Sequence, residues 1–289
     1  MGIVHIVCAI VAMLIVIGVG AYFSVAALGT RFSAEKKTYS FCSEQDFEHV
    51  RLEPTFLLKL HHLLYVSDKI LTEANVRYCA IGGTLLSMER SGYLTPWDDD
   101  GDLAVFESDL NARRTKVDAL LKEHKVHLTE PFSFFANLGV FHLRLDDDHP
   151  LNKRWPSDDQ PFVDWMLFAP LAGRVDSKYR EPIHHFARKG ERDIFPKSYI
   201  TERQMFPLRR QPLKVFSDKQ EALLDPELAV ENCTLWLVSP ANNAPLLTRE
   251  YGTAAEPEMW RTCYLASSHR SALLFVKPCR LTDAQIEKM

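Results

Sequence analysis

The stretch Pro96-Trp97-Asp98-Asp99-Asp100-Gly101-Asp102-Leu103-Ala104-Val105 places four carboxylates within five consecutive positions, directly before an apolar run. Carboxylates this close repel one another, and a folded chain tolerates them only in open water or around a cation that neutralises them. Residues two apart on a strand share a face, so we expect three of the acids to line one side: Asp98, Asp100 and Asp102. Hard oxygen ligands grouped in this way suit Mg²⁺ or Mn²⁺.

Two other interpretations of these acids stay open. They could form a solvated acidic turn, or the calcium loop of an EF-hand, in which Asp98, Asp100, Asp102 and Asp109 would occupy positions 1, 3, 5 and 12. An EF-hand loop turns sharply on glycine at position 6, whereas this chain has Leu103 there and continues with a strand pattern. The pattern therefore favours a strand that binds magnesium or manganese.

A glycine pair lies upstream, in Gly82-Gly83-Thr84. It follows a β-rich stretch at 76–81 and precedes a helical pattern at 84–90, and the N–H groups at the start of a helix attract phosphate. An ordinary turn would also explain the pair on its own. Placed before an Asp-x-Asp strand, however, it matches the layout of a nucleotidyltransferase palm, in which a third aspartate comes from a later strand.

Asp164 is the candidate for that third aspartate. It is the one acid in the apolar stretch 162–168, where an isolated charge is costly unless it is paired or bound to a metal. A carboxylate satisfied by backbone N–H groups or by an arginine is the alternative. His142, on an expected strand, is interpreted as a core histidine rather than as part of the site.

The wider pattern predicts an α/β (α+β) domain over 51–289, with a small mixed sheet flanked by helices. Leucines at near-helical spacing predict one helix, and Ser108 is expected to cap another. The expected helices are 52–74, 84–90 and 108–123, and the expected strands are 76–81, 102–106, 138–145 and 162–168. After residue 170 prolines become frequent, and loops are expected to dominate.

The run from Ile81 to Leu103 resembles the signature of the LicD family, which includes bacterial phosphocholine transferases and the eukaryotic fukutin and fukutin-related proteins. The likeness consists of a glycine-rich turn, a helix ending in arginine, and then Pro-Trp-Asp-x-Asp-x-Asp. Shorter similarities, beginning with Val163-Asp164, extend it over about 77–252, with the core motifs in 77–170. Gly101 departs from the family, which usually has a bulky apolar residue there, so the strand is expected to be looser at this point.

The resemblance implies transfer of a phosphorylated small alcohol, of the ribitol phosphate or phosphocholine type, from a CDP-activated donor to a glycan hydroxyl, with release of CMP. Asp100 and Asp102 would bind Mg²⁺ or Mn²⁺, and Asp164 would be a metal ligand, a base for the acceptor hydroxyl, or both. Asp98 would assist them as a catalytic partner. The donor phosphate would be held by Gly82, Gly83, Thr84 and Arg90, although a surface salt bridge is an equal reading of Arg90.

Two further functions remain open: a true nucleotidyltransferase that attaches a nucleoside monophosphate, and a non-catalytic relative that binds a glycan or a partner enzyme. The retained acids argue against a purely binding role, because such a role does not need four placed carboxylates.

The first thirty residues contain no Lys, Arg, Asp or Glu, and the run from Ile6 to Leu28 has the roughly 20 apolar residues that a bilayer core requires. We therefore expect a transmembrane signal-anchor at 1–30 and a polar stem at 31–50. A cleaved signal peptide, with Ser24-Val25-Ala26-Ala27 as its cleavage region, and a buried core helix are the alternatives.

The sidedness signals disagree. Arg31, Lys36 and Lys37 follow the span, and by the positive-inside rule they would keep the bulk of the chain in the cytosol. Asn232-Cys233-Thr234 is instead a glycosylation acceptor pattern at Asn232, which would suit a lumenal domain. The layout resembles that of the type II eukaryotic members, so we expect a single-pass protein of the Golgi or endoplasmic reticulum with a lumenal catalytic domain and a glycan or glycoprotein acceptor.

Composition narrows the function classes. Lys and Arg number 34 against 38 Asp and Glu, a formal net charge of −4, which gives no basic surface for nucleic acid. The 46% hydrophobic and 25% charged shares exclude a disordered chain. Five of the six cysteines lie outside the apolar span, and none is spaced as in a CxxC zinc site.

Overall fold

A computed structural model describes residues 43–45, 52–90, 92–95, 98–129, 139–157, 160–170, 182–185, 194–209, 232–237, 243–244, 247, 262–263, 279–280, 282 and 284–285. The chain divides into two units, Met1–Tyr39 and Ser40–Met289, and the described residues all belong to the second. The expected membrane anchor and most of the expected stem lie outside the described residues. None of the described helices is both long enough and apolar enough to cross a membrane.

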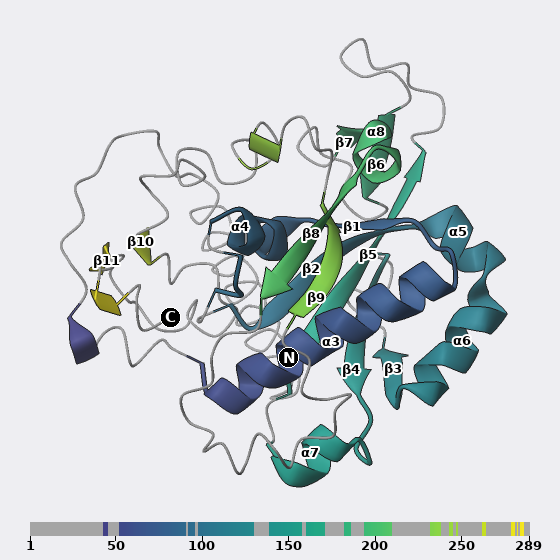
Figure 1. Ribbon diagram of the computed structural model, residues 1–289. Coiled ribbons are helices and arrows are strands. Elements are labelled where there is room, and N and C mark those ends of the chain that lie inside the picture. The colour runs from purple at the N-terminus through teal and green to yellow at the C-terminus, as the bar shows by residue number, and fades with distance from the viewer. Residues whose placement is uncertain are drawn as a thin grey trace, which may run out of the picture. The chain divides into compact units, whose positions relative to one another are not determined.

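A mixed sheet forms the centre of the domain, as predicted (Figure 1). Its strands follow the order β3-β4-β5-β2-β1-β9-β8, and β6 pairs antiparallel with both β5 and β7. Their bounds are β1 Tyr78–Ala80, β2 Asp100–Phe106, β3 Val126–Thr129, β4 Val140–Leu145, β5 Phe162–Pro170, β6 Pro182–His185, β7 Ile194–Pro196, β8 Gln204–Arg209 and β9 Asn232–Leu237. The neighbours β2 and β5 are parallel, while β4 and β5 are antiparallel. A separate pair consists of β10 (Thr262–Cys263) and β11 (Cys279–Arg280).

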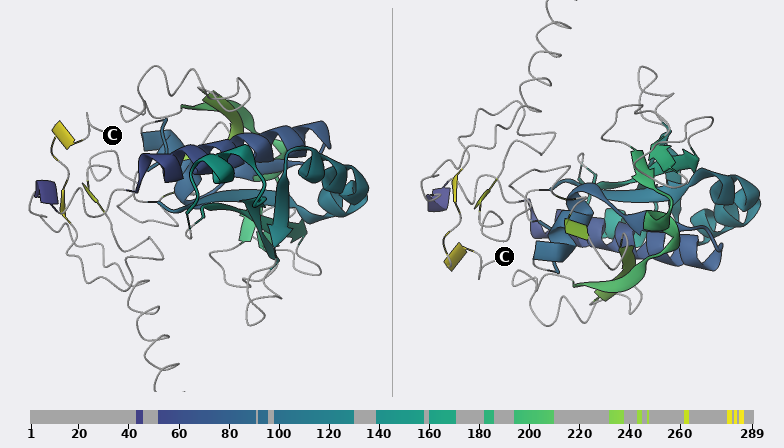
Figure 2. Two further views of the ribbon diagram at one scale, coloured as in Figure 1. Left: turned by 90° about the horizontal axis from the view of Figure 1, so that it is seen from below. Right: turned by 90° about the horizontal axis from the view of Figure 1, so that it is seen from above.

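Helix α3 (Pro54–Glu73) lies along one face of this sheet (Figures 1 and 2). Pro54 starts it, at a position where the missing N–H costs nothing. Its apolar residues recur at helical spacing and are fully buried, among them Leu60 and Leu64. A buried hydrogen bond from Trp165 Nε1 to Ser67 Oγ, 3.1 Å long, ties the helix to β5. This face of the sheet is therefore filled, and any site has to lie on the other face.

The helix expected at 108–123 is wrong in two respects. It is two helices, α5 (Glu107–Ala112) and α6 (Arg114–Glu123), and Phe106 rather than Ser108 precedes the first turn, with no side-chain cap. Helix α5 packs on β2 and β5, whereas α6 packs on β3, so a break at Arg113 lets each segment meet its own strand.

The expectation of loops after residue 170 is also wrong in part, because β8 and β9 extend the main sheet. Strand β9 pairs with β1 and packs under α3, and Leu235 is fully buried there. Strand β8 ends the strand order and contains Pro207, which an outermost strand tolerates because one side of it needs no ladder partner. The shorter helices are α4 (Gly82–Arg90), α7 (Pro150–Arg154) and α8 (Ser198–Thr201).

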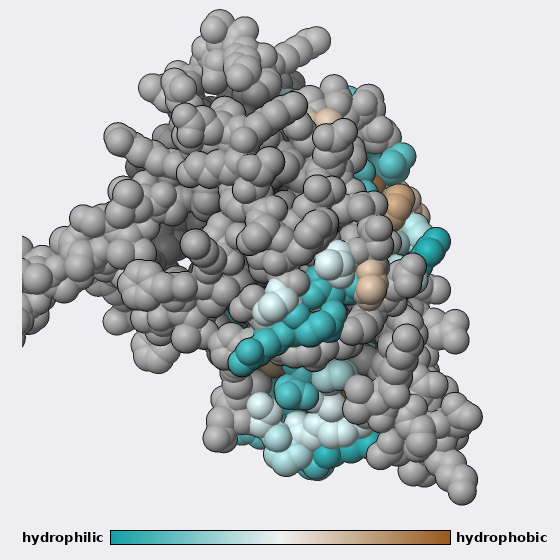
Figure 3. Space-filling view, turned by 90° about the vertical axis from the view of Figure 1, so that its left-hand side faces the viewer, coloured by the Kyte–Doolittle hydropathy of each residue, from teal (hydrophilic) through white to brown (hydrophobic). Residues whose placement is uncertain are grey.

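Described surfaces are largely polar. In the face shown in Figure 3, the described residues are mostly hydrophilic. The large hydrophobic side chain that is exposed within the described part of the chain is Met205. Among the described cysteines, Cys79 and Cys233 are buried and form no disulfide bond.

Candidate active site

The predicted aspartates meet where β2 and β5 run side by side. Their parallel register places Asp102 directly opposite Asp164, and Asp100 opposite Phe162. Asp100, Asp102 and Asp164 each offer a carboxylate oxygen, and these oxygens lie within 4.8 Å of one another. The neighbouring residues Gly101 and Trp165 face α3, so the three acids lie on the opposite face of the sheet, as the alternation predicted.

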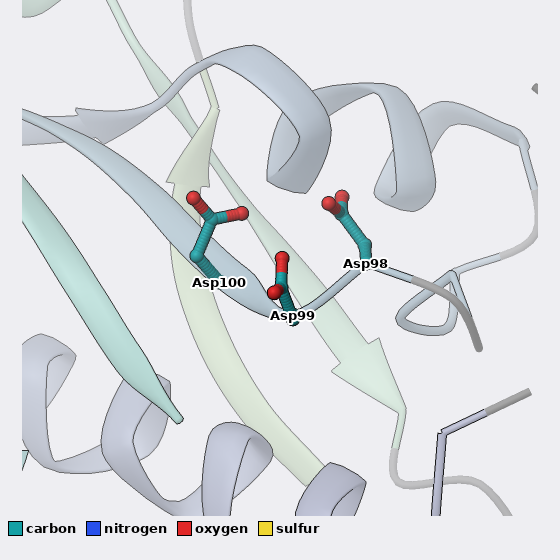
Figure 4. Close-up of side chains that lie close together, drawn as sticks. All are labelled: Asp98, Asp99 and Asp100. Atoms are coloured by element: carbon teal, nitrogen blue, oxygen red, sulfur yellow. The ribbon is translucent and has the colours of Figure 1, made fainter. Parts of the chain in front are cut away.

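A second group of carboxylates adjoins the first. Asp98, Asp99 and Asp100 also offer oxygens within 4.8 Å of one another, so Asp100 belongs to both groups. Figure 4 shows the three carboxyl groups on one side of the chain as it enters β2. The sequence did not select Asp99, because two-residue alternation would turn it to the other face. Strand β2 begins only at Asp100, so that alternation does not apply to the buried Asp99.

The glycine pair begins helix α4 and lies directly against these acids. The Gly83 N–H donates to Asp102 Oδ2 over 2.7 Å, and the Asp102 N–H donates to Thr84 Oγ1 over 2.8 Å. A β-carbon at Gly82 would lie 2.4 Å from Asp102 Oδ2, and one at Gly83 would lie 2.3 Å from Asp98 Oδ2. Gly82 also has a φ of +55°, which other residues rarely adopt. The glycines are thus required to make room for the carboxylates, and their role toward a donor phosphate stays a prediction.

The electrostatics of the cluster favour a bound cation. Burial raises the pKa of Asp102 well above its usual range, and the nearby charges of Asp100, Asp164 and Asp98 raise it further. The hydrogen bond from Gly83 opposes this rise. The electrostatic cost of ionising Asp102 beside the other carboxylates is removed when a divalent ion neutralises them. The clustered oxygens are also the ligand type that Mg²⁺ and Mn²⁺ prefer, so the residues present fit the predicted metal.

The EF-hand alternative is excluded by Asp109. This residue lies in α5, where its carboxylate accepts hydrogen bonds from Arg77 Nε at 2.5 Å and Arg77 Nη2 at 2.7 Å. The pair lowers the pKa of Asp109 despite its partial burial. Because Asp109 is bound to Arg77 and residues 100–106 form a strand, the acids cannot form one calcium loop.

Residues 75–216 match the family model described as LicD/FKTN/FKRP, nucleotidyltransferase domain. This part of the chain is a LicD domain. The match contains all of the site's aspartates, the glycine pair and β4, and it ends before β9. Among curated proteins none matches the chain. The LicD family comprises phospho-alcohol transferase-like proteins, so the domain has the general character that the aspartate motif indicated.

On the far side of Asp164, strand β4 brings two further residues to the site of the LicD domain. His142 lies opposite Asp164 in the antiparallel register, with its Nε2 3.3 Å from Asp164 Oδ1. The His142 ring stacks on Phe162 at 4.4 Å, and Arg144 Cζ lies 4.7 Å from the centre of the same ring. The sequence placed His142 in the core. His142 and Arg144 are two residues apart and so share a face of β4. That this face meets Asp164 can be predicted only once β4 is known to pair with β5.

Two predicted residues are not brought to the LicD carboxylates by any described contact. Arg90 ends α4, about 12 Å along the helix from Gly82 at 1.5 Å per residue, and its side chain lies outside the described residues. Its predicted role as a phosphate clamp stays untested. Asn232 is the first residue of β9, and its side chain also lies outside the described residues.

The expected looseness at Gly101 is not what the packing of the LicD domain shows. A β-carbon there would lie 2.9 Å from Leu64 Cδ2 and 3.2 Å from Val163 Cγ2. Leu64 on α3 thus fills the space that a bulky residue would take. Helix α3 and strand β2 are closely packed at this point, which holds Asp100 and Asp102 on either side of Gly101 in place.

Proposed function

We propose that the protein is a metal-dependent transferase that moves a phosphorylated small alcohol, of the ribitol phosphate or phosphocholine type, from a CDP-activated donor to a glycan hydroxyl. The observation that carries this proposal is that Asp100 belongs to two groups of acids, one at the entry to β2 and one on β2 and β5. A carboxylate shared by two neighbouring sites is the arrangement that suits a pair of divalent ions. The LicD membership supports the donor class and the leaving group.

Asp98, Asp99, Asp100, Asp102 and Asp164 would hold Mg²⁺ or Mn²⁺. When bound, the metal would supply positive charge to the phosphoryl oxygens and to the leaving oxygen. The protein residues would do the remaining work by positioning. Gly83 holds the Asp102 carboxylate through its N–H, and the positive end of the α4 dipole faces the same region.

The reaction forms a bond between the acceptor oxygen and the phosphorus of the alcohol phosphate. The bond from that phosphorus to the bridging oxygen of CDP breaks, and CMP leaves with the electron pair. Asp164 would take the proton of the acceptor hydroxyl, which then passes to solvent. His142 Nε2 lies 3.3 Å from Asp164 Oδ1 on the other side and would hold this carboxylate toward the acceptor.

For the cellular setting, we propose a single-pass anchor at residues 1–30 and a lumenal domain in the Golgi or endoplasmic reticulum. The support is the uncharged N-terminal run and the acceptor pattern at Asn232. The expected result is a glycosidase-sensitive mobility shift of the cellular protein that Asn232→Gln abolishes. A chain that is unglycosylated and open to cytosolic protease would contradict the lumenal placement.

The activity is tested by incubating the full chain in detergent with Mn²⁺ and a panel of CDP-alcohols, and assaying CMP release. We expect release with one donor, and at least a 100-fold loss in Asp100→Asn because a shared ligand is removed. Asp147→Asn changes an exposed loop acid and is the matched control, with activity unchanged. No release from any donor, with Asp100→Asn equal to the wild type, would favour a non-catalytic relative.

A further inference from the structure

Arg144 is a half-buried cation on β4, beside the carboxylates and outside the mechanism proposed above. Among the described residues it makes one hydrogen bond, from Nη1 to the Gln160 carbonyl oxygen at 3.2 Å, and no ion pair. A guanidinium carries five N–H donors in a fixed fork. Burial lowers the pKa of Arg144, and the charge of Asp164 acts in the opposite direction. A guanidinium keeps its charge in proteins, and most of the donors of Arg144 have no partner in the described structure.

The other arginines near the sheet differ from it. Arg77 forms a bidentate pair with Asp109, and the exposed Arg114 pairs with Asp118. Arg203 is also half-buried, but its Nη1 donates to the backbone carbonyl of Tyr78, away from the carboxylate cluster. Desolvating a charge is costly unless a partner compensates for it. Among these four described arginines, Arg144 is thus the one whose position calls for an anionic partner at the site.

The guanidinium is held in a fixed orientation. The Phe162 ring contacts both His142 and Arg144, and Phe162 lies opposite Asp100 in the register. The bond to Gln160 fixes one end of the fork. A planar fork that is already oriented loses little entropy when it binds an oxyanion through two parallel hydrogen bonds.

The position of Arg144 also indicates which side of the reaction it serves. The strands run in the order β4-β5-β2-β1, and the start of α4 contacts Asp102 on β2. At about 4.8 Å per strand, β4 lies about 10 Å from β2, with Asp164 between them. Attacking and leaving oxygens lie on opposite sides of the phosphorus in an in-line displacement. If the donor phosphates lie near α4, the acceptor enters over β5 and β4.

We propose that Arg144 binds an oxyanion of the substrate, a phosphate or carboxylate, on the β4 side of the carboxylates, and that this group belongs to the acceptor. The inference rests on the proposed function, because it takes the aspartates as the reaction centre. It adds a substrate class: an acceptor glycan that carries a negative charge near the reacting hydroxyl.

The test measures binding by calorimetry to the full chain in detergent with saturating Mn²⁺. The probes are CDP for the donor and glucose 6-phosphate for a phosphorylated sugar, with glucose as the blank. We expect Arg144→Gln to weaken glucose 6-phosphate binding about 10- to 100-fold, as for loss of a charge-assisted hydrogen-bonded pair, and Arg144→Lys to weaken it less. Mn²⁺ affinity should be unchanged or higher, because a nearby positive charge is removed. Arg114→Gln also removes an arginine that packs on an aromatic ring of β4, Phe141, and should leave both probes unaffected.

The binding results distinguish an acceptor role of Arg144 from a donor role and from no role in binding. Weaker binding of CDP alone assigns the oxyanion to the donor and overturns the acceptor assignment. Equal affinities of the wild type and Arg144→Gln for both probes overturn the proposal for Arg144 and leave the proposed function standing. A wild-type chain that binds neither probe overturns it as well, and the CMP-release assay then shows separately whether the proposed function has failed.

Discussion

At the scale of single residues, His142 is the side chain that we expect to orient the Asp164 carboxylate. The His142 Nε2 lies 3.3 Å from Asp164 Oδ1, and stacking on Phe162 fixes the ring. Hydrogen-bond partners of metal-binding carboxylates orient them, and their loss typically reduces metal affinity about 10- to 100-fold. We therefore expect His142→Phe, which keeps the stacking and loses the ring nitrogen beside Asp164, to weaken Mn²⁺ binding by about that factor in calorimetry. His142→Gln keeps a donor and should restore most of the affinity.

The matched control for this prediction is another histidine–aspartate contact. His127 Nδ1 lies 2.6 Å from Asp146 Oδ1 at the exposed end of β3. His127→Phe should leave Mn²⁺ affinity at the wild-type value. Equal Mn²⁺ affinity in the wild type and His142→Phe would show that Asp164 needs no positioning by His142.

At the scale of elements, the contact between α3 and β2 depends on complementary side-chain volumes at Gly101 and Leu64. A valine at 101 would push into Leu64 Cδ2, which is 2.9 Å from the position of its β-carbon. Overpacking of this kind costs about 1–3 kcal/mol, and Leu64→Ala alone would cost about 2–5 kcal/mol through its cavity. The valine would occupy part of the space that Leu64→Ala leaves empty. The double variant should therefore lose at least about 1 kcal/mol less unfolding free energy than the sum of the two single losses. Unfolding free energies from urea titrations of the four proteins measure this coupling, and additive losses would contradict it.

Local patterns predicted the centre of the site because its parts are encoded locally. The run from Asp98 to Asp102 precedes its own strand, and Asp164 is a lone acid in an apolar stretch, so each could be selected without knowing its neighbours. His142 and Arg144 could not, because their meeting with Asp164 depends on β4 pairing with β5. Pairings between strands distant in sequence are set by the whole domain.

The same reasoning explains the errors in the elements. Pro207 suggested a loop, but as part of an outermost strand it interrupts no ladder on its free side. The expected helix at 108–123 had continuous helical periodicity. Its break at Arg113 follows from packing against different strands, which periodicity does not reveal.

At the scale of the whole domain, two buried histidines link the packing of α3 to acid stability. Burial, followed by the charges of His149, His61, His124 and Lys69, lowers the pKa of His62 to about 3. Burial is also the main cause that lowers the pKa of His149 to about 4; the charges of Lys125 and Lys59 add to this, and those of Asp146 and Asp148 oppose it. The two rings lie 5.1 Å apart. His149 Nδ1 accepts the Leu151 N–H at 3.2 Å, at the start of α7, and protonation of that nitrogen would remove this cap.

The sign of the pH effect follows from these directions. Both folded-state pKa values lie below the ordinary value of 6.5, so the unfolded chain takes up protons first as the pH falls. The stabilising contribution of the two neutral histidines is therefore fully present above about pH 6.5 and is lost as the pH falls from there to 3–4. For His62 the loss in unfolding free energy at pH 5 is about 2 kcal/mol. We expect His62→Leu, a change of similar volume, to reduce the difference between the unfolding free energies at pH 7.5 and pH 5 by about 2 kcal/mol. The exposed His127→Leu should keep the wild-type difference. If His62→Leu loses as much stability on acidification as the wild type, His62 does not control the acid response, and the loss comes from His149 or from carboxylates elsewhere in the domain.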